Sequence, residues 1–185
     1  SGTPKMQGPE CCALEVCNMH PDDWEQVATI YFQHFQVEKD LVKDMLMQKY
    51  KAYPLAMNWQ SARTLVLKLH DKIVGATTLR LHEKFSFVEV VLFATHKDHE
   101  RCGFGSLLSS VVLHKAYEVH CDRILLRASK TATPFWSSQG FKGYTYGSSD
   151  LLGAYNDHHC LILPETCQMQ RNIPVKHAWL AFSLC

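Results

Sequence analysis

Two features are scarce in this sequence: long hydrophobic runs and an excess of charge of one sign. No apolar stretch approaches the ~20 residues that are needed to cross a bilayer, and the formal net charge is only +1. A nearly neutral chain has no strong field to draw it to DNA, RNA or anionic lipid. We therefore expect no membrane insertion and no direct binding of nucleic acid.

The start of the chain also lacks the apolar block of a secretory signal peptide. Residues 1–12 include glycine, proline and lysine, and we expect a flexible leader there. The rest of the chain, residues 13–185, is long enough for one domain with its own hydrophobic core. The apolar fraction of the full 185-residue sequence, 46%, is ordinary for a soluble globular protein.

The paired C-x2-C spacing of common zinc modules is absent from the eight cysteines. The cysteines are scattered, and the chain is long for a disulfide scaffold. We expect reduced thiols in an intracellular protein, and no bound metal. A zinc site built from Cys11, Cys12, Cys17 and His20 is the alternative.

What the sequence does contain is a succession of helix and strand patterns without internal repeats. Apolar residues from Trp24 to Phe35 recur at helical spacing directly after a helix-start sequence, His20-Pro21-Asp22-Asp23. The full series that we expect is a strand over 13–18, helices over 24–35 and 39–50, strands over 64–69, 73–81 and 86–95, a long helix over 103–120, a strand over 123–127, a short helix over 134–138, a polar loop over 143–157 and a strand over 159–163.

Two kinds of connection fix the expected topology. Short turns join the strands over 64–69, 73–81 and 86–95, which is typical of an antiparallel meander. The long helix between the strands over 86–95 and 123–127 is typical of a crossover between parallel strands. The sequence therefore predicts an α/β domain with a mixed, mostly antiparallel central sheet and helices on both faces.

Glu89 is a carboxylate in an otherwise apolar stretch, residues 88–93. Burial disfavours the charged form of a carboxylate and raises its pKa. A glutamate whose pKa moves toward neutral pH is suited to act as a general base. The alternative is structural: strand residues alternate between faces, so Glu89 would point to water beside an apolar face.

The segment Glu100–Ser106 follows a predicted strand and opens a predicted helix. Gly103 and Gly105 permit a tight turn, so successive N–H groups and the helix N-terminus can face one anion, such as a pyrophosphate. The dinucleotide fingerprint G-x-G-x-x-G is absent because residue 108 is leucine, and the P-loop ending G-K-[ST] is absent too. A Rossmann cofactor and a nucleoside triphosphate are therefore disfavoured.

The spacing connects these two features, because Gly103 follows Glu89 by 14 residues. The strand that carries the carboxylate leads directly into the candidate phosphate loop. One strand–loop–helix unit can then hold a thioester near one end and a pyrophosphate near the other. Acetyl-CoA is a molecule of that shape.

Three segments together resemble the GNAT superfamily of N-acetyltransferases, and most of all its PCAF-like branch of histone and protein lysine acetyltransferases. Residues 73–80 and 87–94 are similar to the two central strands of that branch, and Glu100–Ser106 is similar to the [QR]-x-x-G-x-[GA] acyl-CoA loop. Residues 128–141, which end in Gln-Gly-Phe, resemble the closing segment. The resemblance covers about residues 64–141.

The resemblance implies a role for each matching residue. Glu89 falls where that branch has its general base. The residues implied in acetyl-CoA binding are Phe93, Ala94 and Thr95 on the strand, the loop residues Glu100, Arg101, Cys102, Gly103, Phe104, Gly105 and Ser106, and Thr131 near the closing segment.

Three positions depart from the family pattern. Glu100 replaces the usual glutamine or arginine of the loop, with Arg101 and Lys97 nearby to offset its charge. Thr131 stands where the closest relatives have an aromatic residue against the cofactor. Trp136 stands where many small-molecule members have a tyrosine that protonates the leaving thiolate, and this favours a protein substrate because the lysine-modifying branch lacks that tyrosine as well.

Other polar residues have structural interpretations beside functional ones. His96 and His99 flank the loop, where they would contact phosphate or simply be solvated. Cys102 at a helix start would have a lowered thiol pKa, but direct transfer in the family disfavours an acyl-cysteine route. His158-His159 is a weak metal signal. The tyrosines of the predicted loop over 143–157, Tyr144, Tyr146 and Tyr155, would shape a substrate groove or lie on ordinary surface.

From these residues and the resemblance we expect the chain to transfer an acetyl group from acetyl-CoA to a protein lysine, with a histone tail as one candidate partner. We expect Glu89 to take the proton from the amine, and no metal to be needed. Acetylation of a small amine is the first alternative, and a non-catalytic acyl-CoA-binding or interaction domain is the second. The resemblance implies a nuclear location, with the cytoplasm as the alternative, and fits a domain of a larger chain.

Overall fold

The computed structural model describes residues 14–49, 58–145 and 151–174 of the chain. Within these ranges, none of the helices has the length and apolar character that spanning a bilayer requires. The elements, in chain order, are β1 (Leu14–Asn18), η1 (Pro21–Asp23), α1 (Trp24–Phe32), α2 (Lys39–Leu46), β2 (Ala62–Leu69), β3 (Lys72–His82), η2 (Glu83–Phe85), β4 (Phe87–Thr95), η3 (Lys97–His99), α3 (Phe104–Glu118), β5 (Arg123–Ser129), α4 (Thr133–Ser138), β6 (Lys142–Gly143), α5 (Leu151–His159) and β7 (Thr166–Asn172).

The strands form one sheet in the order β1-β2-β3-β4-β5-β7-β6. β1 to β4 are an antiparallel meander, as the short turns predict. α3 carries the chain from β4 to β5, and these two strands are parallel. β7 and β6 complete the sheet with antiparallel pairing. The expected α/β domain with a mixed, mostly antiparallel sheet is therefore confirmed.

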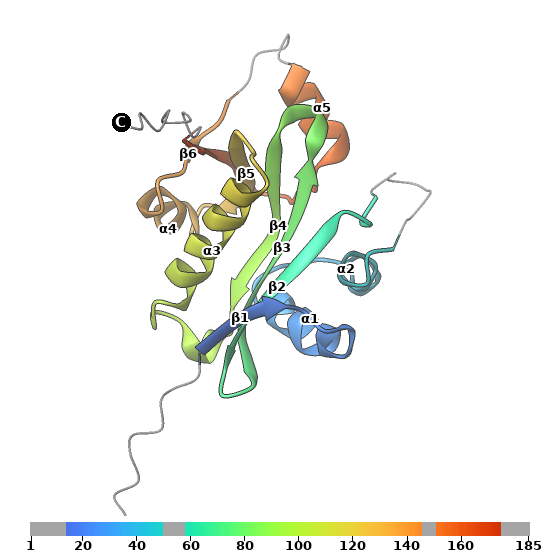
Figure 1. The fold of residues 1–185 in the computed structure, drawn as a ribbon, viewed down its shortest axis with the longest axis vertical. Helices are drawn as coiled ribbons and strands as arrows, with labels where there is room; N and C mark the ends of the chain where they lie inside the picture. Colours follow the sequence, from blue (N-terminus) through green and yellow to red (C-terminus); the bar gives the residue numbers. More distant parts are fainter. Residues whose placement is uncertain (1–13, 50–57, 146–150, 175–185) are drawn as a thin grey trace, which may run out of the picture.

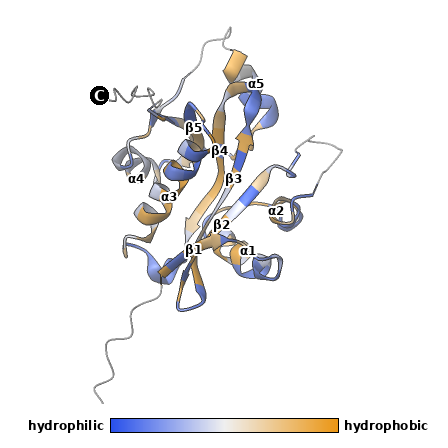
Figure 2. Ribbon diagram, in the orientation of Figure 1, coloured by the Kyte–Doolittle hydropathy of each residue, from blue (hydrophilic) through white to orange (hydrophobic). Residues whose placement is uncertain are grey.

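Helices cover both faces of this sheet (Figure 1). α1 and α2 pack on one face, where Val27 and Leu92 belong to one buried cluster. α3 and α4 pack on the other face, where Val112 and Val90 belong to a second cluster. Figure 2 shows hydrophobic residues concentrated along the central strands, between the two helical layers. Burial of these two layers is the main stabilising contribution to the fold.

α5 lies at the end of the sheet where the β3–β4 hairpin turns (Figure 1). It contributes to a third and smaller buried cluster, in which Leu152 and Cys160 meet Phe87 and Leu125. α5 therefore lies over the starts of β4 and β5, on the face opposite α3.

The last third of the chain differs from the prediction. The predicted polar loop over 143–157 overlaps the helix α5, which runs to His159, and the strand expected over 159–163 is found instead at β7. Leu152 and Tyr155 give α5 the i, i+3 spacing of a helix face, but the polar residues around them hide this pattern. β7 has few large apolar residues, and it is a strand because its backbone pairs with β5 and β6.

Other boundaries move by a few residues. The second helix ends at Leu46 rather than near residue 50, and the long helix begins at Phe104 and ends at Glu118. The proposed leader, residues 1–12, lies outside the described residues, and so do Cys11, Cys12 and Tyr146. The alternative zinc site is therefore not described as a whole.

Candidate active site

The neighbouring strands β4 and β5 separate halfway along β4. They pair in parallel over only four positions, from Phe87 opposite Arg123 to Val90 opposite Leu126. Each strand continues for several residues past that point. A register shift between β3 and β4, at Thr78/Leu79, falls at the same level. The result is a split in the sheet, and the β4 edge beyond Val90 is left for another extended molecule to pair with.

The three strand residues predicted to bind the pantetheine arm lie on this edge. Phe93, Ala94 and Thr95 are the last residues of β4, beyond its last pairing with β5. Ala94 is buried, while Phe93 and Thr95 are half-buried. The structure therefore brings all three to the split, directly before the loop that leads to α3.

The predicted phosphate loop has the backbone conformation that an anion cradle needs. Arg101 and Gly103 both have left-handed backbone angles, with φ of 60° and 82°. Such turns aim successive N–H groups at a common point. α3 begins at Phe104, and the first N–H groups of a helix have no acceptor within it. Most of the loop, Glu100, Arg101, Cys102, Gly103 and Ser106, is exposed to solvent, while Phe104 and Gly105 are half-buried.

Aromatic side chains line the α3 side of the split. Phe93 packs against Phe135 and Trp136, with ring centroids 5.9 and 4.8 Å apart. A Cβ atom on Gly105 would lie 3.4 Å from the Phe135 ring. The second glycine of the loop thus allows α3 to lie close to this aromatic group, which closes the split on one side.

The remaining candidate residues make contacts within their own segments. Thr131 is exposed, and its hydroxyl hydrogen-bonds that of Ser129. His96 accepts a hydrogen bond from the backbone N–H of Asp98, which caps the short helix η3. Cys102 is exposed, and its thiol lies 3.6 Å from the Glu100 carbonyl oxygen. These contacts give the residues local structural roles.

Glu89 lies in β4 one residue before the last β4–β5 pair, so its backbone is next to the split. Val88 and Val90 belong to the core under α3, and strand residues alternate between faces. Glu89 therefore faces the opposite side of the sheet from α3. Its side chain is not solvated, because the residue is only 4% exposed.

The Glu89 carboxylate is fully hydrogen-bonded. Oε2 lies 2.9 Å from Arg80 Nε and 2.7 Å from Arg80 Nη2, and 2.9 Å from His82 Nε2. Oε1 accepts a hydrogen bond of 2.8 Å from the backbone N–H of Leu161. Arg80 is itself buried, lies over the Trp59 ring, and donates to the His159 carbonyl oxygen.

These partners reverse the expected direction of the pKa shift. Burial alone would raise the pKa of Glu89, as we expected from the sequence. The hydrogen bond from His82, the positive charge of Arg80 and the Leu161 N–H favour the carboxylate, and together they hold the pKa of Glu89 below its ordinary value. The expectation of a raised pKa was wrong, because the sequence analysis omitted the charge that β3 places opposite Glu89.

The ionised carboxylate also fixes the donor in its contact with His82. A carboxylate can only accept, so the proton of the 2.9 Å contact is on His82 Nε2. Arg80 Nε, which lies 3.2 Å from the same nitrogen, must then donate to Glu89. The other ring nitrogen of His82, Nδ1, is hydrogen-bonded to the hydroxyl of Tyr155, 3.2 Å away. The cluster is therefore a buried ion pair between Arg80 and Glu89 to which His82 and Tyr155 are attached.

Three of these groups also satisfy the spacing of metal ligands. One ligand atom each from His82, Glu89 and Cys160 lies within 4.8 Å of the others. The guanidinium of Arg80 already supplies a positive charge to the same carboxylate. Burial raises the pKa of the Cys160 thiol, which favours the neutral form over the thiolate that binds metals. The arrangement fits a buried ion pair better than a metal centre.

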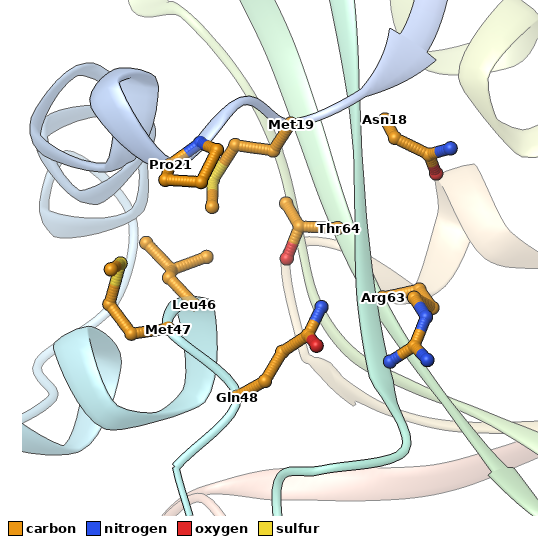
Figure 3. A pocket seen from close by; sticks show the side chains of 8 residues that line it. All are labelled: Asn18, Met19, Pro21, Leu46, Met47, Gln48, Arg63 and Thr64. Carbon is orange, nitrogen blue, oxygen red and sulfur yellow. The ribbon is translucent and has the colours of Figure 1, made fainter.

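Two cavities of about 200 Å³ each are present among the described residues. The first lies between α2 and the ends of β1 and β2 (Figure 3). Its one charged side chain, Arg63, donates to two backbone carbonyl groups, so this cavity has no candidate base. The second cavity reaches the Glu89 cluster, and its lining residues are Asn58, Ser61, Arg80, Leu81, His82, Tyr155 and His159.

The direction of the Glu89 pKa shift predicts how stability depends on pH. A carboxyl group with a lowered pKa in the folded state stabilises the fold above its unfolded pKa, and this contribution disappears as pH falls through the folded pKa. We expect wild type to melt at a higher temperature than Glu89→Gln at pH 7, and the difference to shrink below about pH 4.5. Thermal melts between pH 7 and 3 measure this, with exposed Glu25→Gln as control. A difference that grows with acidity would contradict the shift.

Arg80, His82 and Leu161 are not among the site residues predicted from the sequence. The sequence does contain a pattern that predicts the position of Arg80. A hairpin that turns at residues 83–86 brings residue 80 opposite residue 89, as the register shows. An arginine opposite a buried glutamate predicts an ion pair. Leu161 had no such signal, since its contribution is a backbone N–H in a segment that was assigned to a strand.

Comparison with solved structures identifies the fold as that of the GNAT acetyltransferases. Tetrahymena GCN5 superimposes with a TM-score of 0.68 and 13% identity, over 88% of this chain and 96% of that one. Ard1 from Thermoplasma volcanium has a TM-score of 0.64 and 19% identity, over 88% and 99%. N-acetylglutamate synthase from Neisseria gonorrhoeae, solved with coenzyme A, has a TM-score of 0.64 and 10% identity over 89% of this chain. The match spans about a third of the synthase, 36%.

The chain belongs to the family described as Increased DNA methylation 1, C-terminal domain, whose model matches residues 31–172. The matched range includes the split between β4 and β5, the loop before α3, and Glu89 with its partners. No curated protein matches the chain in sequence.

Proposed function

We propose that this protein is an acetyl-CoA-dependent N-acetyltransferase that modifies a lysine side chain of a protein. The observation that carries the proposal is the arrangement at the split. One strand, β4, presents an unpaired edge that leads into an anion-binding turn, and it places a carboxylate beside the same split on the opposite face. A thioester in the split would then be next to Glu89, while its pyrophosphate faces the start of α3.

The residues fit acetyl-CoA by their backbone more than by their side chains. Phe93, Ala94 and Thr95 offer an extended edge for the pantetheine arm, whose amides can pair with a strand. The turn around Gly103 and the start of α3 offer N–H groups to the pyrophosphate. Glu100 is exposed, so its charge points to solvent and is screened there. When bound, acetyl-CoA supplies the acetyl group and a thiolate leaving group.

Glu89 is the proton acceptor in this proposal. It accepts a proton from the lysine ammonium, directly or through a water molecule, and the free amine then attacks the thioester carbonyl. A carboxylate with a lowered pKa is a weak base, so the site must also lower the pKa of the lysine ammonium. Burial lowers the pKa of an amine, and the positive charge of Arg80, 2.7 Å from Glu89, offsets the carboxylate charge that would otherwise favour the ammonium.

A protein substrate is supported by the position of Trp136. The residue is buried and packs against Phe93, Phe135 and Phe141, with ring centroids 4.8 to 5.0 Å apart. It is a core residue and has no hydroxyl with which to protonate a thiolate. The site thus lacks the tyrosine that the resemblance assigns to many small-molecule enzymes at this position. The PCAF-like branch, a histone tail as partner and a nuclear location stay proposals that rest on the resemblance.

One observation favours a second candidate function, an acyl-CoA-binding domain without catalysis. Both oxygens of Glu89 are occupied by Arg80, His82 and Leu161. A carboxylate held in this way could serve only to fix β3, β4 and the segment after α5 together. This alternative predicts tight binding of acetyl-CoA and no transfer to any amine.

Two measurements on the same protein separate these candidates. Calorimetry measures the binding of acetyl-CoA, and mass spectrometry measures acetylation of core histones, lysine peptide libraries and a panel of polyamines. Acetylated lysine in peptides or histones supports the proposal. Acetylated polyamines alone support a small-molecule enzyme, and binding without any product supports the non-catalytic domain. The absence of acetyl-CoA binding would contradict all three.

The conformation of Gly103 provides a test of the phosphate loop. An added Cβ would meet no atom within 4 Å, but φ is +82°, and an L-residue there costs about 1–2 kcal/mol. Since the loop must keep this conformation to present its N–H groups, we expect Gly103→Ala to weaken acetyl-CoA binding on the order of tenfold. Calorimetry measures the change. Gly143→Ala, also in open space, is the control, and equal affinities for both variants would contradict the cradle.

A further inference from the structure

α5 and the residues that follow it are attached to the Glu89 cluster by backbone and side-chain contacts. The N–H of Leu161 donates to Glu89 Oε1 over 2.8 Å. The carbonyl oxygen of His159 accepts from Arg80, and the Tyr155 hydroxyl lies 3.2 Å from His82 Nδ1. In this structure, the segment from Tyr155 to Leu161 therefore covers the carboxylate from the side opposite α3.

The side of α5 that faces the sheet is only partly apolar. Leu152 and Cys160 belong to the small third cluster, and Arg127 of β5 lies 3.7 Å from Asp157 of α5, so the helix lies over β5. Asn156 is only 2% exposed, and its Nδ2 has no hydrogen-bond partner in the part of the chain that the structure describes. A buried amide group without a partner costs free energy, so α5 is held less firmly than a fully apolar helix would be.

The sheet surface that faces α5 is also only partly apolar. Met169 of β7 belongs to the core under α3, so Gln168 and Gln170 face the other side, as strand alternation requires. Gln168 is 8% exposed, and among the described residues neither its Oε1 nor its Nε2 has a hydrogen-bond partner. Within the same part of the chain, Gln170 Oε1 and Arg127 Nε also lack partners. We call Arg127, Gln168 and Gln170 the polar floor.

The polar floor is continuous with the Glu89 site. Gln170 is opposite Leu125 of β5, and Leu125 is opposite Glu89 of β4. Gln168 is opposite Arg127, which directly follows the last paired residue of β5, Leu126. The floor thus lies on the same face as the carboxylate and level with the split, with Arg127 one strand away and Gln168 and Gln170 two strands away.

We propose that α5 and Leu161 form a lid over the acceptor site, and that lifting the lid exposes the polar floor to the main chain of an extended, lysine-containing peptide. The inference rests on the proposed function, since it identifies the acceptor of the same site. In the closed state the Leu161 N–H occupies the place at Glu89 Oε1 that the acceptor amine takes when the lid opens.

The chemistry of the floor selects a peptide as the occupant. The side-chain amide of Gln168 has one free acceptor and two donors, which match the N–H and C=O of a peptide group. Gln170 Oε1 offers a further acceptor beside it. A simple alkylamine has no amide groups to pair with these atoms, so the floor contributes nothing to its binding. The lid and floor together therefore favour lysine within a polypeptide.

Gln168→Met gives the sharpest test, because methionine has a similar size and no hydrogen-bonding amide. Removing an unpartnered buried amide does not destabilise a fold, so we expect an unchanged or higher melting temperature. We also expect the KM for a lysine peptide to rise about tenfold, since two peptide hydrogen bonds are lost. Gln26→Met, on the exposed side of α1, is the matched control and should change neither value.

Asn156→Leu tests the lid itself. An apolar side chain under α5 should hold the lid closed, which would slow hydrogen exchange of the amides in residues 155–161 and lower kcat/KM for the peptide. In wild type, adding the peptide together with coenzyme A should speed exchange in the same residues.

The possible outcomes separate this inference from the proposed function. If wild type acetylates no amine, the proposed function fails. If wild type acetylates peptides but Gln168→Met keeps the wild-type KM, the polar floor is not the peptide site and the inference is overturned. Peptide binding that slows exchange in residues 155–161 would likewise overturn it, since α5 would then clamp the substrate rather than lift.

Discussion

Replacing Glu89 with glutamine is expected to lower the turnover number for lysine acetylation by at least ~100-fold, because the site loses its proton acceptor. Glutamine has the same shape but cannot take a proton at neutral pH. Acetyl-CoA is held by the β4 edge and the loop before α3, so its dissociation constant should change little. Steady-state kinetics with a lysine peptide, together with calorimetry, measure the two effects separately.

The control for this variant is Glu165→Gln, because Glu165 is exposed in the turn before β7, away from the split. It should keep the wild-type turnover number. Full activity of Glu89→Gln at neutral pH would refute the assignment of the base. Loss of both activity and acetyl-CoA binding would mean that Glu89 holds the fold rather than taking a proton.

Replacing Arg80 with methionine is expected to lower the free energy of unfolding by about 3–5 kcal/mol, since removing one partner of a buried ion pair leaves the other charge uncompensated. Arg80 and Glu89 are each 4% exposed, so the remaining charge is buried when its partner is removed. Urea denaturation followed by circular dichroism measures the change.

Two further variants show whether the loss comes from the unpaired charge. In Arg80→Met/Glu89→Gln both charges are gone, and we expect part of the lost stability to return. Arg63→Met removes an exposed arginine from the neighbouring strand β2, and it should change stability by less than ~1 kcal/mol. Equal losses in the single Arg80 variant and the double variant would show that packing of the arginine side chain, rather than its charge, supports the fold.

Most of the fold could be predicted from the sequence because its first two thirds combine regular periodicity with short turns. The β2–β4 meander, the crossover helix α3 and the parallel strand β5 all follow local rules for turns and connections. β7 could not be predicted in this way. Its sequence, Thr166–Asn172, is mainly polar, and its strand conformation depends on pairing with β5, which is distant in sequence.

The candidate site, like the fold, could be predicted only in part from the sequence. Glu89 and the turn at Gly103 could be recognised locally, as a charge in an apolar strand and as glycines before a helix. The environment of Glu89 could not, because its partners come from three separate segments: Arg80 and His82 on β3, and Leu161 after α5. The pKa of a buried group depends on these long-range contacts. A prediction from burial alone therefore has the wrong direction for the pKa shift of Glu89.

The most direct test of the whole account is a crystal structure with a bisubstrate analogue, in which coenzyme A is joined to the lysine of a peptide. We predict that the pantetheine arm pairs with Phe93–Thr95 between β4 and β5, that the pyrophosphate lies at residues 101–106, and that the lysine nitrogen lies within one water molecule of Glu89. If the analogue binds with its lysine on the α3 face of the sheet, away from Glu89, the account is wrong.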